Sequence, residues 1–282
     1  MDTKIECFPC FLKQVVIALQ QLPGGAPDLH QRIFRDVLAI MQKADMSRPP
    51  AYTTTFIHRA VRNILGLDPF KKIKYDYNNL AMGLYPELKK KIATSKDPLW
   101  TASRLAIAGN VIDFGIFTSI DMEGSINRAL EASIAVDDYV SFRKAVGEAD
   151  NILYLLDNSG EIVFDRLLIE ELVLQAGRVT AVVKGSPVLN DVTFEDAVQV
   201  DLPEVCEVIS NGSDAIGTIM EWTSPGFQES FGMSDLIISK GQGNFETLTS
   251  DGKKTYHLFQ SKCDVLSKEL GLPPGAMLLK KS

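Results

Sequence analysis

The segment from Asn151 onward alternates short apolar runs with amphipathic stretches, and this alternation restricts the fold more than any other feature of the sequence. The pattern predicts strands at 152–156, 179–183, 198–200 and 236–239, another near 256–260, and a helix at 162–175. Strands separated by helices favour a mainly parallel sheet that is covered on both faces. The expected fold class is therefore α/β, with a doubly wound, mainly parallel sheet.

The first 147 residues show helical periodicity instead. Apolar residues recur at helical spacing in 8–19, 28–44 and 53–65, in a long segment from Pro69 through 92, in a segment from Asp97 to 108, and in 125–133 and 137–147. No repeat or low-complexity linker separates this part from the rest. We therefore expect a helical N-terminal domain, residues 1–147, packed on an α/β domain, residues 148–282.

Composition and charge limit the classes of partner. With 282 residues, of which 45% are hydrophobic, the chain is long enough to bury a real core. The net charge of -7 and the pI of about 5.1 disfavour non-specific binding to nucleic acid. There is no basic leader and no apolar run of about 18 residues, so we expect a cytoplasmic protein without a membrane partner. A small polar metabolite is the expected partner, and the oligomeric state is left open, a homo-oligomer included.

Three predicted strands are followed by unusually polar loops. These loops are Asp157 to Glu161, Lys184 to Asp191, and Lys240 to Glu246. Ligands of an open parallel sheet bind beyond the carboxyl ends of the strands, where such loops meet. We therefore expect the three loops to form one site.

The first two loops carry ligands for a hard metal ion. Asp157, Asn158 and Asp191 offer carboxylate and amide oxygens, which suit Mg²⁺ or Mn²⁺. Neighbouring strand residues point to opposite faces, so Asp157 and Asn158 can share an ion only if the chain turns after Leu156. Ser159 and Gly160 permit that turn. Asp and Asn also end hydrophobic segments as turn formers or helix caps, which is the structural alternative.

The same loops hold groups that suit a phosphate. Glycines let backbone amides approach phosphate oxygens, and a lysine adds positive charge. The candidates are Ser159, Gly160, Glu161, Lys184, Lys240, Gly241, Gln242 and Gly243. A metal-bound water and a neutralised phosphoryl group would then favour phosphate ester hydrolysis.

A further polar stretch, Gly109 to Gly115, follows a predicted helix. Asn110 and Asp113 stand there among apolar neighbours. Gly109 could be a helix C-cap with both side chains satisfying loose backbone groups, or the two side chains could line the site.

Other motifs restrict the chemistry. The third glycine position of a dinucleotide fingerprint is Glu246, and no Walker A sequence is present. An aspartyl-phosphate mechanism normally needs an aspartate where this chain has Ser159. The Cys7-Phe8-Pro9-Cys10 pair leaves three alternatives open: structural packing, a second metal site, or redox activity. Three histidines, His30, His58 and His257, are sparse support for a His-dependent nucleophilic triad.

Four ordered motifs resemble those of the ARMT-like damage-control phosphatases, a family long labelled only as a domain of unknown function. They are GNVID at 109–113, DNSGE at 157–161, KGSPVLNDVT at 184–193 and KGQGNFE at 240–246. The resemblance covers nearly the whole chain. It includes the N-terminal C-x-x-C pair of the stand-alone prokaryotic-type members.

This resemblance implies a helical region packed on a doubly wound α/β domain, with a divalent metal, Mn²⁺, Mg²⁺, Ni²⁺ or Co²⁺, bound where they meet. The metal ligands map onto Asp157, Asn158 and Asp191. Asn110 and Asp113 map onto the cleft, and Lys240 onto the basic residue at the phosphate. The implied activity is hydrolysis of phosphate monoesters, such as sugar phosphates or damaged phosphometabolites.

From these residues we expect metal-activated water to attack in line, with Asp113 or Asp191 assisting proton transfer. Three alternatives remain: a phosphopantetheine-type phosphatase, a non-catalytic binder of metal and phosphorylated metabolites, and a redox protein acting through Cys7 and Cys10.

Overall fold

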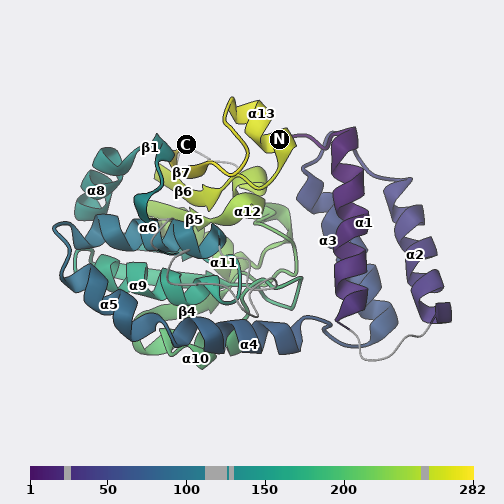
Figure 1. The fold of residues 1–282 in the computed structure, drawn as a ribbon, viewed down its shortest axis with the longest axis horizontal. Coiled ribbons are helices and arrows are strands. Elements are labelled where there is room, and N and C mark those ends of the chain that lie inside the picture. Colours follow the sequence, from purple (N-terminus) through teal and green to yellow (C-terminus); the bar gives the residue numbers. More distant parts are fainter. Residues whose placement is uncertain (22–26, 112–125, 127–129, 249–253) are drawn as a thin grey trace.

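The computed structural model of the chain describes residues 1–21, 27–111, 126, 130–248 and 254–282. Its first helices form a separate bundle at one end of the molecule, with its own small apolar core around Phe11, Ile33 and Ile57 (Figure 1). The bundle comprises the 3-10 turn η1 (Ile5–Cys7) and helices α1 (Phe8–Gln20), α2 (Pro27–Met41) and α3 (Pro50–Leu65). Gly66, with φ of 67°, ends α3 in the left-handed conformation that glycine adopts without strain.

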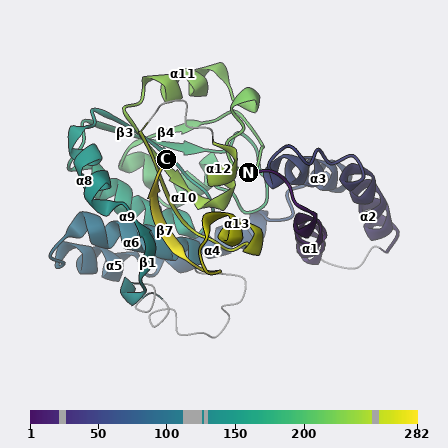
Figure 2. The same cartoon turned by 90° about the horizontal axis from the view of Figure 1, so that it is seen from above.

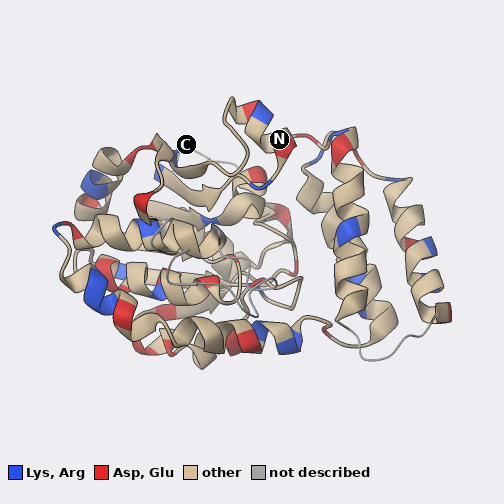
Figure 3. Cartoon of the chain, viewed as in Figure 1, with Lys and Arg blue, Asp and Glu red and all other residues tan. Residues whose placement is uncertain are grey.

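The next helices belong to the α/β part, although Ile73 of the first of them also packs against the core of the bundle. They are α4 (Lys71–Met82), α5 (Tyr85–Ala93), α6 (Pro98–Val111), α8 (Tyr139–Glu148) and α9 (Glu161–Val173). The long helix predicted from Pro69 is therefore two helices, and Pro86 lies in the first turn of the second, where it costs no hydrogen bond. Both basic and acidic residues lie on α4 and α5 (Figure 3), and Lys72 pairs with Asp76 within α4.

One seven-stranded sheet organises the remaining chain. Its strands are β1 (Ile134–Asp137), β2 (Asn151–Leu155), β3 (Arg178–Val183), β4 (Glu207–Ser210), β5 (Leu236–Lys240), β6 (Lys254–Gln260) and β7 (Met277–Lys281). The order is β1-β7-β6-β5-β2-β3-β4, and every pair is parallel except β6 with β7. The predicted α/β class with a mainly parallel sheet is thus confirmed.

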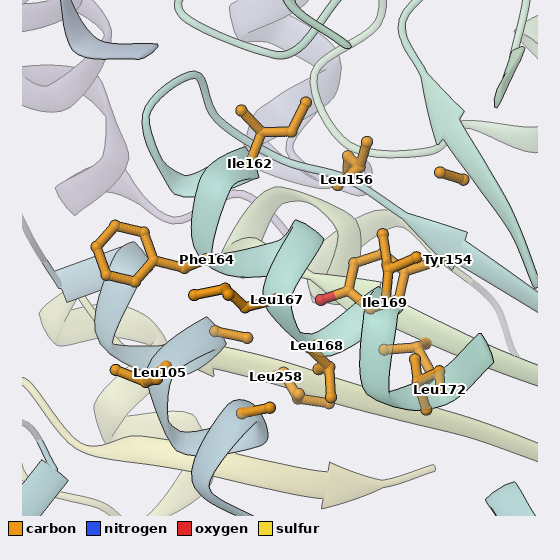
Figure 4. Packing of buried hydrophobic residues seen from close by; sticks show 14 of the residues in the cluster. Leu105, Tyr154, Leu156, Ile162, Phe164, Leu167, Leu168, Ile169, Leu172 and Leu258 are labelled. Carbon is orange, nitrogen blue, oxygen red and sulfur yellow. The ribbon is translucent and has the colours of Figure 1, made fainter. Parts of the chain in front are cut away.

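Helices cover both faces of the sheet (Figure 2). Alternate residues of β2 point to opposite faces, so Ile152 and Tyr154 pack towards α9 while Leu153 and Leu155 pack towards α11 (Pro225–Met233). The larger core lies on the α9 face, where Phe164 and Leu167 of that helix meet Leu105 and Leu258 (Figure 4).

Shorter elements complete the fold. They are α10 (Phe194–Gln199), η2 (Leu202–Glu204), η3 (Met220–Trp222), α12 (Gly241–Thr247) and α13 (Asp264–Leu270). Across the described ranges, no helix combines the length and apolarity that a membrane span requires.

Three element predictions are wrong. The strand predicted at 198–200 lies at the end of α10, because Thr193 and Asp196 form a capping box that starts a helix there. The region up to 147 is not all helical, because β1 pairs with β7. The predicted loop at Gly109 and Asn110 is the last turns of α6. The domain division at 147 and 148 itself stays a prediction.

The chain crosses over at β2. From β2 it proceeds through β3 to β4 on one side, and then returns to β5 and β6 on the other side. The carboxyl ends of β2 and β5 therefore flank a topological switch point, where ligands of open α/β sheets bind.

Candidate active site

The loops that follow β2 and β3 are joined by backbone hydrogen bonds. The amide of Val192 donates to Asp157 O at 2.9 Å, and the amide of Ser159 donates to Asn190 O at 2.8 Å. Asn158 and Asp191 thereby face each other in an isolated antiparallel bridge. The structure thus brings together the three residues predicted as metal ligands.

Two side-chain amides hold the Asp157 carboxylate. Nδ2 of Asn158 donates to Asp157 Oδ2 at 2.6 Å, and Nδ2 of Asn110 donates to the same oxygen at 3.3 Å. Both amides also donate to Glu161 Oε2, at 3.1 and 2.8 Å respectively. These bonds turn the Asn158 Oδ1 atom away from both carboxylates, whereas Asn110 Oδ1 accepts from the Gln260 amide at 3.2 Å. Asn110 therefore positions Asp157, and Asn158 keeps an oxygen for a ligand.

Negative charge accumulates at this point. Burial, followed by the carboxylates of Glu161 and Asp191, raises the pKa of Asp157 well above its usual range, although Lys262 and Lys184 oppose the rise. Burial likewise raises the pKa of Asp191 to about 6, against the nearby Lys184. Within the described ranges, Asp157 has no lysine or arginine at ion-pair distance. Such a carboxylate is costly unless a cation compensates it.

The donor set fits a divalent cation. Asp191 Oδ2 is buried, lies 3.5 Å from Lys184 Nζ and has no hydrogen-bond partner among the described atoms. No three His, Cys, Asp or Glu side chains of the described residues are arranged to hold a metal by themselves. The candidate site therefore depends on the amide oxygen of Asn158, together with Asp157 and Asp191, and hard oxygen donors of this kind suit Mg²⁺ or Mn²⁺.

Gly241 leaves room for the Asp157 carboxylate because it has no side chain. Its φ is 79°, and a Cβ atom built there would overlap the Asp157 carboxylate. The residue was predicted to bring an amide to a phosphate. In the structure it is buried, and its Cα surface lies against Asp157 instead.

Lys240 does not reach the cavity in which Asp157 lies. Its ammonium is fully buried and donates to Glu161 Oε1 at 2.5 Å, Asp165 Oδ1 at 2.6 Å and the Ala106 carbonyl at 2.9 Å. Two buried carboxylates need this cation, so it is unavailable for the predicted contact with phosphate. Its structural role is to fix Glu161, which in turn orients Asn110 and Asn158.

The turn after Asn158 is also directed inward. Gly160, with φ of 78°, donates its amide to Asn78 Oδ1 of α4 at 2.7 Å, and Ser159 Oγ donates to Asp196 Oδ1 at 3.1 Å. Ser159 and Glu161 are each 1% exposed. In this arrangement the side chains of Ser159 and Glu161 and the amide of Gly160 have partners within the protein, and their predicted contacts with phosphate stay a prediction. The predicted turn itself is present.

Lys184 faces a different hollow. Its Nζ donates to the Gly217 carbonyl and lies beside Asp191. It also lines a groove with Gly185, Lys71 and Phe194. Lys184 thus compensates the charge of Asp191, and it is not among the residues that line the cavity of Asp157.

A cavity of about 290 Å³ opens over Asp157 and Asn158. Of the predicted residues, Asn110, Gln242 and Gly243 also line it. Cys7 and Cys10, predicted as a possible second metal or redox site, line it as well. The remaining lining residues were not predicted as site residues: Met1, Phe11, Gln14, Pro50, Ala51, Thr54, Ile216, Glu246, Lys262 and Cys263. The bundle helices α1 and α3 therefore form one wall of the cavity.

Some of these lining residues could have been predicted from their position in the sequence. Lys262 and Cys263 follow the predicted strand at 256–260, so they lie at the same sheet edge as the other loops. Gln14 and Thr54 carried none, because the docking of a helical bundle is not encoded in local spacing. Asp113, predicted as a catalytic residue, lies outside the described residues.

The cysteine pair lies at this cavity together with a third thiol. Cys7 is buried, Cys10 is exposed, and both are free, as is Cys263. Burial raises the pKa of both Cys7 and Cys10, which leaves less reactive thiolate at neutral pH. Structural packing is the alternative that this environment favours for Cys7.

Comparisons with known proteins agree along the whole chain. Residues 3–278 match the model of the damage-control phosphatase ARMT1-like domain. A damage-control phosphatase of Pyrococcus horikoshii is 32% identical over 100% of this chain and 99% of its own length, and one of Archaeoglobus fulgidus is 32% identical over 97% of each. A protein of Methanocaldococcus jannaschii is 35% identical over 99% of this chain and 95% of its own. The crystal structure of a DUF89 family protein from Pyrococcus horikoshii superimposes with a TM-score of 0.92 at 31% identity, covering 100% of this chain and 99% of that one.

Proposed function

The chain belongs to the damage-control phosphatase ARMT1-like domain family, and from this membership we propose that it is a phosphatase acting on small phosphate monoesters with a divalent metal ion. Two of its relatives bear the name damage-control phosphatase. The observation that carries the metal part of the proposal is the Asp157 carboxylate, which is crowded by Glu161 and Asp191 and lacks a paired cation among the described residues. Asp157, Asn158 and Asp191 would hold the ion.

The protein side of the reaction is positioning. A bound divalent ion lowers the pKa of water and offsets charge that develops on a phosphoryl group. Asn110 and Glu161 hold the Asp157 carboxylate and the Asn158 amide in fixed orientations. Lys240 holds Glu161 in turn. Preorganised groups of this kind lower a barrier because they need not rearrange during the reaction.

The cavity supports a small substrate. Its volume of about 290 Å³ lies at the lower end of the ~300–1,000 Å³ typical of ligand sites. Polar groups from Gln14, Thr54 and Gln242 line it beside apolar ones from Phe11 and Ile216. A sugar phosphate or another phosphorylated metabolite of similar size suits these dimensions.

Metal removal tests the proposal. Protein treated with a chelator should lose hydrolysis of a panel of sugar phosphates and regain it with Mn²⁺, Mg²⁺, Co²⁺ or Ni²⁺. Asp157→Asn should lower metal affinity in calorimetry and reduce kcat by a factor of ~100 or more. The matched control is Asp150→Asn, an exposed carboxylate just before β2, which should behave as the wild type.

The outcome also separates the alternatives. Hydrolysis that is indifferent to chelation would contradict the metal-dependent mechanism. Tight binding of phosphorylated ligands without release of phosphate after prolonged incubation would favour a non-catalytic binder.

A further inference from the structure

Hydrolysis of a sugar phosphate needs a proton at the ester oxygen. When the bond between phosphorus and this oxygen breaks, the oxygen becomes a strongly basic alkoxide, and a positioned acid accelerates such a step by about 10²–10⁴-fold. A carboxyl group binds a metal ion in its ionised form, so Asp157 and Asp191 do not supply this proton while they hold the ion. The proton must come from another group at the cavity.

Glu246 is a carboxyl group of the cavity outside the predicted metal ligands. Among the lining residues that the structure describes, only Asp157 and Glu246 carry a carboxyl group. Glu246 belongs to α12, whose first residue, Gly241, lies against the Asp157 carboxylate. The two ends of this segment are about 7.5 Å apart along the helix axis. The cavity therefore places Glu246 within the length of a small substrate from Asp157.

The side chain of Glu246 is directed back towards the start of α12. Helical side chains lean towards the helix N-terminus, and Gln242 Nε2, one turn earlier, donates to Glu246 Oε1 at 2.6 Å. Gln242 is fixed in turn, because its Oε1 accepts from the amide of Lys262 at 3.2 Å. Oε2 of Glu246 accepts no hydrogen bond from the described residues, and none of their lysines or arginines lies at ion-pair distance from it. Oε2 is therefore the oxygen that can carry a proton and donate it.

The surroundings keep this carboxyl group protonated near neutral pH. Burial raises the pKa of Glu246 to about 7, although the hydrogen bond from Gln242 and the amino terminus of Met1 oppose the rise, and Glu269 of α13 adds to it. Among the described residues, α3, β5 and β6, which pack on α12, contribute no charged side chain to the cavity. The other ionisable side chains that line it are Asp157, Lys262, Cys7, Cys10 and Cys263. An acid whose pKa is near the working pH is the most effective proton donor.

We propose that Glu246 is the general acid of the reaction and donates its proton to the ester oxygen of the substrate as the phosphorus–oxygen bond breaks. This role rests on the proposed function, since it takes hydrolysis of a phosphate ester as the reaction. The hydroxyl of the attacking water forms the new bond to phosphorus, and its second proton passes to solvent. The alcohol leaves, and the Glu246 carboxylate regains a proton from solvent.

The dependence of the rate on the leaving group tests the proposal. The 4-nitrophenolate anion is weakly basic and leaves without a proton, whereas the alkoxide of a sugar does not. In the full chain with Mg²⁺ or Mn²⁺, Glu246→Gln should lower kcat for a sugar phosphate by a factor of about 100 or more, and kcat for 4-nitrophenyl phosphate by less than about threefold. The matched control is Glu229→Gln, an exposed carboxylate of α11 outside the cavity, which should keep the wild-type rates on both esters.

The pH dependence provides the second measurement. The acid form of Glu246 is lost as the pH rises through about 7, so kcat of the wild type for the sugar phosphate should fall above that pH. Glu246→Gln should lack this fall. Thermal unfolding checks that the variant, which keeps the shape of the side chain, is folded.

The two proposals fail in different ways. A folded Glu246→Gln variant that loses activity equally on both esters, or that keeps the wild-type kcat and pH profile, overturns the acid role and leaves the phosphatase function standing. A wild type that releases phosphate from neither ester contradicts the phosphatase function itself. If only the sugar phosphate is hydrolysed, the pH profile decides: the same fall above pH 7 in the variant overturns the acid role.

Discussion

At the residue scale, the geometry of Asp157 depends on contacts from distant parts of the chain. Asn110 comes from α6 and Asn158 from the next position, and both donate to Oδ2. Gly241, the first residue of α12 directly after β5, lies against the carboxylate without a side chain of its own. A carboxylate held from three directions can present its remaining surface to a ligand in one orientation.

Gly241→Ala should therefore disturb both stability and activity. A Cβ atom would overlap the Asp157 carboxylate, and the positive φ disfavours alanine, so we expect a loss of more than about 1 kcal/mol in the free energy of unfolding. Displacement of Asp157 should also reduce metal affinity and kcat. Urea unfolding, metal calorimetry and hydrolysis rates measure the three effects.

The control for this substitution is Gly226→Ala in α11. A Cβ atom there meets nothing within 4 Å, so stability should be unchanged or slightly higher. Equal metal affinity in Gly241→Ala and the wild type would show that the glycine is not needed to seat Asp157.

At the element scale, α6 positions Asn110 by packing tightly on α9. Gly109 lies where the two helices meet, and a Cβ atom would lie 2.9 Å from Phe164 Cγ. The glycine is therefore needed for close approach of the helices, and the next residue, Asn110, reaches Asp157 and Glu161 from the end of α6.

Gly109→Ala should push α6 and α9 apart. Overpacking at a buried contact costs about 1–3 kcal/mol, and we expect a loss of stability in that range with a fall in kcat, because Asn110 moves with the helix. Gly147→Ala in α8 is the matched helix control. Its Cβ atom would lie in open space, so it should raise stability by up to about 1 kcal/mol. A Gly109→Ala variant as stable as Gly147→Ala would contradict the packing role.

The elements also show what periodicity can predict. The apolar runs of β2, β3, β5 and β6 were predicted because strands buried on both faces are nearly continuous in hydrophobicity. Gly109 was expected to lie in a loop, since a glycine needed for helix contact and one that caps a helix look alike in sequence. β1 and β7 were missed because their pairing joins segments separated by more than 130 residues.

At the scale of the whole molecule, the cavity is completed by docking of the α1, α2 and α3 bundle on the α/β part (Figure 2). The proximity of Asp157, Asn158 and Asp191 could be predicted because the loops that carry them follow the neighbouring strands β2 and β3. Their role as metal ligands stays a prediction. The direction of the Lys240 side chain could not be predicted, because it depends on the ion pairs that its ammonium forms with Glu161 and Asp165 in the folded protein. The role of Gln14 and Thr54 depends on docking, which no local pattern encodes.

An ion-pair cluster joins the bundle to the α/β part. Arg59 of α3 donates to both carboxylate oxygens of Asp214, and Arg62 donates to Oδ2 at 2.5 Å. The Asp214 side chain is 18% exposed. Although burial alone would raise the pKa of Asp214, the hydrogen bonds from the two arginines hold it below its usual value.

Asp214→Asn should loosen this docking. We expect a loss of about 1–3 kcal/mol at neutral pH, because two partly buried arginines lose a charged acceptor. Because the folded pKa of Asp214 is depressed, the advantage of the wild type is fully present above the unfolded pKa of about 3.9 and disappears as pH falls through the lower folded value. Urea unfolding of both proteins from pH 7 down to the acid limit of folding measures the difference.

An exposed pair at the same interface provides the comparison. Arg48 and Glu221 meet at 3.1 Å with side chains 43% and 50% exposed, so Glu221→Gln should change stability by less than about 0.5 kcal/mol. If Asp214→Asn were equally mild, the cluster would not stabilise the docking of the bundle. Asp214→Asn could instead lower the free energy of unfolding and also raise KM. Because Asp214 does not line the cavity, that result would show that docking of the bundle contributes to substrate binding.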